Sequence, residues 1–287
     1  MKVNYTIRYR KSWLFSLFFL LFFSTKGTAQ NADQYSFTPV AGTFTSIVGQ
    51  PGIGLIPTIH NDDGISNGNV PFQFTFNYCG NNYTGFKVCS NGWVSFSSTS
   101  STTSNNDANN LAQIKPALMP LWDNLSGAAN LGASALFTTT GTAPNRVFIY
   151  ECNNWGWNNN ALSGVLSFQI RLYETTNIIE FVYRPELGNI SNPADATIGI
   201  TDGNATPTFL TLNNASANPT ASSTTFTTTI NTKPANGQIY RFTPPPPCNG
   251  APPAAVVSPA GPMSIGVAAT AKLSSILVPP GSGVGNQ

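Results

Sequence analysis

The sequence predicts an all-β protein built as an antiparallel, jelly-roll-like β-sandwich. Only 8% of its 287 residues are charged, against about 25% in ordinary soluble domains, so the residues from which long helices are made are scarce. Hydrophobic residues make up 41% of the chain and aromatic ones 11%, which is enough to fill a large core. Between Tyr35 and Thr243, short alternating runs are separated by Gly, Asn, Asp and Pro, a pattern typical of strands and turns.

The clearest strand is expected at residues 71–78, where an aromatic side chain occupies every second position and all of these side chains share one face. A tight turn at residues 80–82 leads into a second strand at residues 83–88. This turn would place Cys79 opposite Tyr83. The two runs together predict a β-hairpin.

Further strands follow the same logic. Residues 93–96 come after Asn91-Gly92, a pair that favours positive φ, and residues 164–173 alternate cleanly before a second hairpin partner at residues 178–183. Other strands are expected at residues 146–152, 197–201, 209–212, 226–230 and 238–242, for about eleven to thirteen in all. Residues 97–110 are a low-complexity loop with nothing to bury, and residues 109–115 form at most a short helical turn.

The amino terminus has the three parts of a secretory signal peptide. A basic stretch precedes the apolar run at residues 13–23, and the small residues Gly27-Thr28-Ala29 follow. The alternative is a membrane anchor, but the run has about half of the roughly 20 residues that a membrane helix requires. We therefore expect residues 1–29 to be removed, leaving a secreted, extracellular protein, at the cell surface or free, with no membrane span.

The carboxy-terminal part changes in composition after the sandwich, which is expected at residues 30–243. Four prolines at residues 244–247 form a stiff spacer. Residues 248–287 are too few for a sandwich of their own. We interpret them as a truncated second β-module of the Ig-like or fibronectin-like kind, poorly ordered.

Charge and cysteine content exclude two classes of function. Five of the 13 basic residues and none of the 11 acidic ones lie in the leader, so the remaining chain has a net charge of −3. It has no cluster of Lys and Arg to neutralise phosphates, which excludes nucleic acid as a partner. His60 is the only histidine and no CxxC occurs among the four cysteines, which argues against zinc. A disulfide among Cys79, Cys89 and Cys152 remains open.

Residues 74–96 read FTFNYCGNNYTGFKVCSNGWVSF. This phrase resembles one found in the amino-terminal β-sandwich of secreted multidomain surface proteins of the Bacteroidota type, and more distantly the nidogen-like extracellular domain. The resemblance covers about residues 35–243 and continues at residues 62–66, 120–123, 143–149 and 168–174. It implies a sandwich followed by Ig-like or fibronectin-like repeats, and it implies an extracellular role. The segment PPPPCNGAPPA resembles the opening of such a repeat.

Two loops carry candidate ligand-binding residues. Asp62 and Asp63 stand beside Gly and Asn in residues 62–68, where carboxylate and amide oxygens could bind Ca²⁺; the alternative is that they make Asx-turns. Asn154, Trp155 and Trp157 lie in a polar stretch where exposed rings and amides could grip a sugar; the alternative is one ring plugging the sandwich.

We expect the loops at residues 59–70 and 153–163 to lie at the same end and to form one polar-aromatic surface. Trp93 and Trp122, on or next to strands, are expected in the core.

Catalysis has little support in the sequence. No nucleophile motif accompanies His60. A carboxylate pair for glycoside hydrolysis could be drawn from Glu151, Glu174, Glu180 and Asp123, but the chain has no more carboxylates in its strands than is ordinary, so they do not single out an active site. We therefore expect a non-enzymatic extracellular module with an adhesin-like role and a glycan or protein ligand. The alternative is a carbohydrate-binding module or a glycoside hydrolase.

Overall fold

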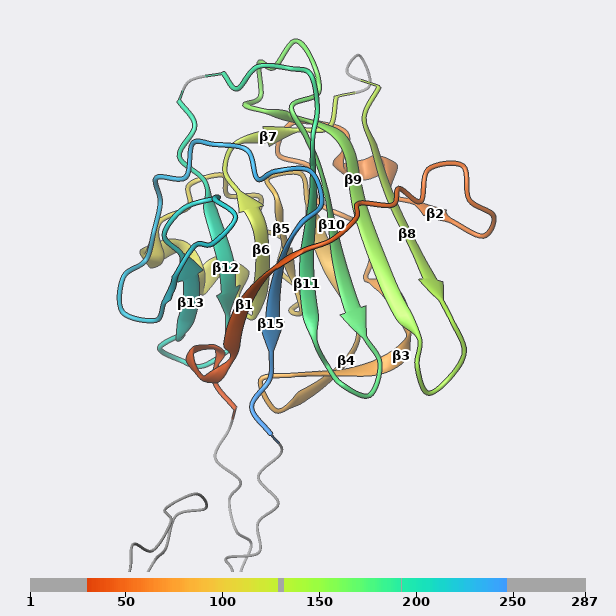
Figure 1. Ribbon diagram of the computed structural model, residues 1–287, viewed down its shortest axis with the longest axis vertical. Helices are drawn as coiled ribbons and strands as arrows, with labels where there is room; N and C mark the ends of the chain where they lie inside the picture. Colours follow the sequence, from red (N-terminus) through yellow and green to blue (C-terminus); the bar gives the residue numbers. More distant parts are fainter. Residues whose placement is uncertain (1–29, 129–131, 192, 247–287) are drawn as a thin grey trace, which may run out of the picture. The chain divides into compact units, whose positions relative to one another are not determined.

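Two antiparallel sheets pack face to face in the computed structural model, which describes residues 30–128, 132–191 and 193–246 (Figure 1). The eight-stranded sheet runs in the order β1 (Ser36–Ala41), β15 (Gln238–Thr243), β11 (Ile179–Pro185), β10 (Leu166–Tyr173), β9 (Val147–Trp157), β8 (Ser134–Thr140) and β2 (Gly54–Leu55), with β7 (Leu125–Ser126) paired to β9. The seven-stranded sheet runs in the order β14 (Ala221–Ser222), β13 (Phe209–Leu212), β12 (Thr197–Thr201), β6 (Ala117–Trp122), β5 (Trp93–Ser95), β4 (Asn81–Cys89) and β3 (Val70–Tyr78). The predicted all-β sandwich is confirmed.

Helical structure in the described part of the chain is limited to single turns. They are η1 (Ala32–Gln34), η2 (Pro57–Ile59), η3 (Ala108–Asn110) and α1 (Leu111–Ile114). The last two confirm the short helical turn expected at residues 109–115. None of the described helices has the length and apolar character needed to cross a membrane.

Aromatic side chains from both sheets fill the space between them. Along β3 the side chains alternate between buried and exposed as far as Phe76, as the spacing of its aromatic residues predicts. The ring of Phe72 lies 4.8 Å from that of Phe148 on β9 and 5.0 Å from that of Phe86 on β4, measured between centroids. Contacts of this kind tie the two sheets together and stabilise the sandwich.

The first hairpin turns one residue earlier than the sequence predicts. Cys79 and Gly80 both have positive φ, at 48° and 76°, which is the backbone of a two-residue turn whose twist matches the strands. Tyr78 is therefore paired with Asn81, and Phe76 with Tyr83. The expected pairing of Cys79 with Tyr83 is wrong, because a cysteine takes the first turn position.

Several strand assignments differ from the sequence prediction, and the ranges of β1 and β8 are not among the predicted strands. Residues 226–230 form only an isolated bridge between Ile230 and Ala196. Strand β6 was not predicted, since it contains Pro120 and all of its side chains are buried, so it shows no alternation. The β6–β12 register shifts between Thr197 and Gly199, and a proline is tolerated inside a sheet at such an irregularity.

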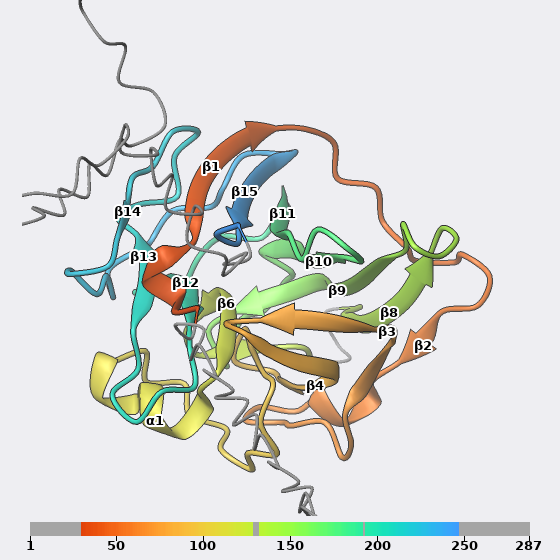
Figure 2. The same ribbon diagram turned by 90° about the horizontal axis from the view of Figure 1, so that it is seen from below.

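Residues 42–53 cross the outer face of the eight-stranded sheet, from the edge strand β1 to the opposite edge strand β2. Both views show this segment passing over β11, β10 and β9 on the side away from the other sheet (Figures 1 and 2). We refer to residues 42–53 as the strap. The predicted signal peptide and second β-module lie outside the described residues.

Candidate functional site

The SNGW sequence at residues 90–93 connects three loops at one end of the sandwich. The buried Asn91 donates its side-chain amide to the carbonyl of Thr102 and to Oδ1 of Asp63, both at 2.7 Å, and its Oδ1 accepts from the Leu125 amide at 3.0 Å. Gly92 has a φ of 73°, and a Cβ there would lie 1.9 Å from the carbonyl oxygen of Leu121. This position therefore requires glycine.

The Ser/Thr/Asn-rich loop at residues 97–110 covers two buried tryptophans. The indoles of Trp93 and Trp122 both donate to the carbonyl of Thr103, at 2.9 and 3.0 Å. Asn106 is buried in the same loop and donates to Oγ1 of Thr197 at 3.1 Å. The prediction that Trp93 and Trp122 are core residues is confirmed, and the expectation that this loop has nothing to bury is wrong.

Trp155 and Trp157 lie on β9, and each is 1% exposed. Their ring nitrogens donate to the carbonyl of Ser90 at 2.9 Å and to Oδ2 of Asp123 at 2.6 Å, respectively. The prediction that these rings are presented to solvent is wrong. The strand continues through both residues because β7 pairs with it, Leu125 opposite Trp157, so the rings point inward and offer no face for a sugar to stack on.

Asn154 directly precedes Trp155 in the chain and has a φ of 56°. Its backbone amide donates to Oγ of Ser167 at 2.8 Å. A Cβ at Gly164 would lie 2.8 Å from the backbone carbonyl oxygen of Asn154, so the close approach of these two segments requires glycine. Asn154 is thus fixed in place beside a surface hollow described below.

The loops that carry Asp62 and Asn159 do lie at the same end of the sandwich, as predicted. The side chain of Asn159 donates to Oδ2 of Asp62 at 3.4 Å, and the rings of His60 and Trp155 stand edge to face at 6.2 Å. The polar half of the predicted surface therefore exists, but the buried indoles remove its aromatic half.

The two aspartates predicted for calcium, Asp62 and Asp63, are both exposed. Asp63 has a φ of 54° and its carboxylate accepts from Asn91, so it serves the turn that holds the SNGW sequence. Across residues 30–128, 132–191 and 193–246, no three His, Cys, Asp or Glu side chains gather as they would around a metal ion. The geometry therefore favours the turn role for Asp63 over the metal role.

The carboxylates weighed for catalysis are engaged in structural contacts. Glu174 forms an ion pair with Arg146 and Glu180 with Arg241, and the hydrogen bond from Arg146 lowers the pKa of Glu174. Asp123 is 4% exposed; its burial raises its pKa, against hydrogen bonds from the Trp157 indole and two backbone amides.

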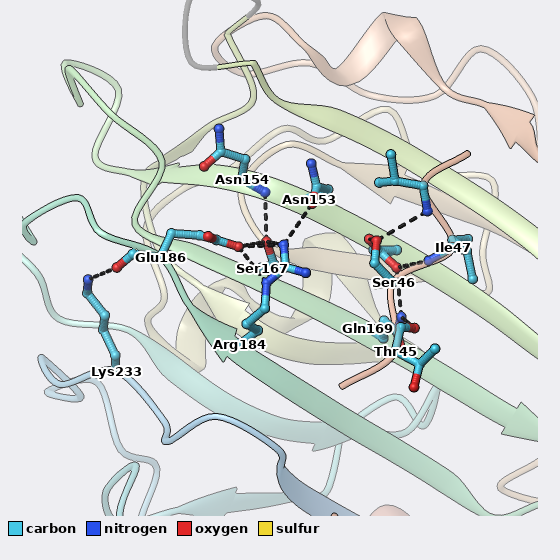
Figure 3. A network of polar contacts seen from close by, with 12 residues as sticks. Thr45, Ser46, Ile47, Asn153, Asn154, Ser167, Gln169, Arg184, Glu186 and Lys233 are labelled. Carbon is cyan, nitrogen blue, oxygen red and sulfur yellow. Dashed lines mark hydrogen bonds and ion pairs between the residues drawn. The ribbon is translucent and has the colours of Figure 1, made fainter. Parts of the chain in front are cut away.

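Glu151 is fully buried on the outer face of the eight-stranded sheet and holds the strap. It accepts from the hydroxyl of Ser46 at 2.5 Å and from the amide of Ile47 at 2.8 Å, and Gln169 donates to it at 2.7 Å (Figure 3). The guanidinium of Arg184 also stands 4.7 Å from the centre of the Phe44 ring. These contacts fasten the strap to the sheet.

The network in Figure 3 continues from the strap toward the end of the sandwich. Arg184 pairs with Glu186, and it also donates to Asn153 and Ser167. Lys233 donates to the backbone carbonyl of Glu186 at 2.8 Å. Glu186 is therefore held from both its side chain and its backbone.

A hollow of about 300 Å³ opens beside Glu186, between the β9–β10 and β11–β12 loops. Its lining is formed by Asn154, Leu162, Ser163, Gly164, Glu186, Leu187 and Gly188. Leu162 is 92% exposed and Leu187 fully exposed. Sequence reasoning missed both leucines, because an isolated leucine in a loop carries no pattern that separates it from a core residue.

The cysteines within the described residues, Cys79, Cys89 and Cys152, are free and buried. Burial raises the pKa of the Cys79 and Cys89 thiols to about 12, so neither is a nucleophile at neutral pH. Of the disulfides left open by the sequence, none forms among these three residues.

Comparison with known proteins gives one result. The family model described as NIDO related matches residues 34–244, which is the sandwich from η1 to the end of β15. No curated protein and no solved structure matches the chain.

Proposed function

Since the chain belongs to the NIDO-related family, we propose that it is an adhesin-like extracellular interaction module that binds a protein partner and has no enzymatic activity. The family match supports a β-rich module of the extracellular kind. The net charge of −3 expected after removal of the leader and the lack of a Lys/Arg cluster in the sequence disfavour nucleic acid as the partner.

One observation carries this proposal: the tryptophans that looked functional in the sequence are part of the buried scaffold, and the most exposed large apolar side chains stand on other positions, in loops. Trp155 and Trp157 are buried and hydrogen-bonded within the sandwich. The two most exposed large apolar side chains of the described residues, Leu162 and Leu187, stand on loops at one end. In sandwich proteins, recognition normally falls to such loops.

The test uses beads coated with the full chain. We expect saturable attachment to cultured cells or to purified extracellular matrix proteins, no attachment of beads coated with heat-unfolded chain, and no preference on a glycan array. Binding to a defined glycan, release of sugar from a polysaccharide, or absence of any attachment would each contradict the proposal.

A further inference from the structure

We propose that the end of the sandwich bearing Leu162 and Leu187 binds a cationic peptide segment with apolar side chains, contributed by an extracellular protein. This inference rests on the proposed interaction role and names the surface and the chemistry of its partner. We call the surface the leucine end. It consists of Asp62, Asn159, Leu162, Glu186, Leu187 and Asp195.

The two leucines are held together by the backbone of their loops. The amide of Glu186 donates to the carbonyl of Val165, and the amide of Gly188 donates to the carbonyl of Gly164, each at 2.9 Å. Lys233 donates to the carbonyl of Gly188 at 2.5 Å. Leu187 thus lies on a loop that is held by hydrogen bonds on both sides, so a partner that binds there does not lose free energy in ordering this loop.

Exposure singles out the same two side chains. Among the described residues, the large hydrophobic side chains classed as exposed are Val48, Leu55, Leu162 and Leu187, at 49%, 66%, 92% and 103%. The last two line one hollow of about 300 Å³. A partner that covers this apolar pair removes its surface from water, which favours association.

Charge favours a cationic occupant, because the exposed aspartates at this end outnumber Lys233, which donates to the carbonyls of Glu186 and Gly188. Asp62, Asp63 and Asp195 are exposed near this end, and the ion pairs found in the described part of the chain include none of them. The side chain of Asn159 donates to Asp62, which places this carboxylate beside the β9–β10 loop. The backbone amide of Asp195 donates to Asp123, which also accepts from the Trp157 indole, so Asp195 stands near the end of β9.

The same carboxylates disfavour two other occupants of the leucine end. A second copy would bring like charges together, and an anionic lipid surface would repel them. A peptide with both cationic and apolar side chains complements both the charge of the aspartates and the apolar surface of the leucines. Its lysines would pair with the carboxylates while its apolar side chains cover Leu162 and Leu187.

The experiment measures the binding of synthetic peptides to the full chain by fluorescence anisotropy. The probe alternates lysine and leucine; matched peptides of the same length alternate glutamate and leucine, or lysine and serine. We expect the lysine–leucine peptide to bind at least about tenfold more tightly than either matched peptide. The double variant Leu162→Ser/Leu187→Ser should weaken its binding at least about tenfold, because each leucine buried is worth about one decade or more in affinity.

Leu55→Ser is the matched control, because it also removes an exposed leucine but lies on β2 and does not line the hollow beside Leu162 and Leu187. It should bind the peptide as the wild type does. Asp62→Asn/Asp195→Asn should weaken binding several-fold at 0.15 M salt, and this difference should vanish at about 1 M salt, where exposed charges are screened within about 3 Å. Circular dichroism checks that every variant folds.

Three results would overturn the inference: equal binding by the double leucine variant, equal binding of the glutamate–leucine peptide, and no binding of any peptide by the wild type. Dimerisation or attachment to phosphatidylserine vesicles that Leu162→Ser/Leu187→Ser abolishes would also overturn it, by assigning the leucines to another occupant. Bead attachment that survives in this variant would leave the interaction role standing and remove only the leucine end. Failure of the wild type to attach removes the interaction role itself.

Discussion

Replacing Trp155 by alanine should destabilise the protein strongly. The indole is 1% exposed, and loss of a buried tryptophan side chain costs about 3–5 kcal/mol. Its ring nitrogen donates to the carbonyl of Ser90 at 2.9 Å, and leaving that buried carbonyl unpaired costs about 1–3 kcal/mol more. A surface ring that served only to bind sugar would cost within about 0.5 kcal/mol. The two roles therefore differ by several kcal/mol.

The assay is urea unfolding of the full chain, followed by far-ultraviolet circular dichroism so that the loss of a fluorophore does not disturb the signal. Trp155→Phe, which keeps a ring but removes the donor, should cost about 1–3 kcal/mol. Leu162→Ala is the control, since its side chain is 92% exposed, and it should leave the midpoint unchanged. A Trp155→Ala protein as stable as the wild type would refute the burial of this ring.

Three further changes test other parts of the sandwich. Gly92→Ala should lower the free energy of unfolding by more than about 2 kcal/mol in denaturant titration, because φ is 73° and the new Cβ would clash with the carbonyl of Leu121; an unchanged midpoint would contradict this. Burial lowers the pKa of His60 below 6.5, and its Nε2 accepts from the Ala135 amide, so the neutral form is favoured in the folded state. That stabilisation is complete above pH 6.5 and is lost as the pH falls toward the folded pKa. The melting temperature should therefore drop more between pH 7.5 and 5 in the wild type than in His60→Gln. Identical pH profiles of the two proteins would argue against a lowered pKa of His60. Glu151→Ala removes the acceptor for Ser46 and Ile47, so limited proteolysis should cut within the strap faster than in the wild type; unchanged cleavage would show that the strap is held by other contacts.

The alternating strands and the core tryptophans could be predicted from the sequence. In β3 the period of two in the aromatic side chains fixes which face is buried. Trp93 and Trp122 stand on or next to predicted strands, where burial is the default for a large ring. These predictions needed only local pattern, and the structure confirms them.

The site could not be predicted, because the bonds that decide it join distant parts of the chain. Trp155 and Trp157 are surrounded by Asn and Gly, which locally indicates an exposed loop, but their ring nitrogens find partners at Ser90 and Asp123. The low-complexity loop has little apolar content, yet the carbonyl of Thr103 accepts from two indoles. The local composition of the chain does not indicate which distant residues these indoles will hydrogen-bond.

The leucine end and the strap were missed for the same reason. Leu187 is unremarkable in sequence, and only the hydrogen bonds between the Gly164 and Gly188 backbones place it beside Leu162. Glu151 reads as an ordinary strand carboxylate until the strap crosses over it. Both features depend on which strands become neighbours, which no local pattern specifies.

The most direct test displays single-residue variants of the full chain on the surface of cells. For each variant it measures the amount of folded protein and the attachment of the displaying cells to purified extracellular matrix proteins. Changes at Asn91, Trp155 or Trp157 should lower folded protein and attachment together, whereas changes at Leu162 or Leu187 should weaken attachment and leave folding intact. A folded Trp155 or Trp157 variant that no longer attaches, or Leu162 and Leu187 variants that attach normally, would contradict the assignment of scaffold to the tryptophans and of recognition to the leucine end.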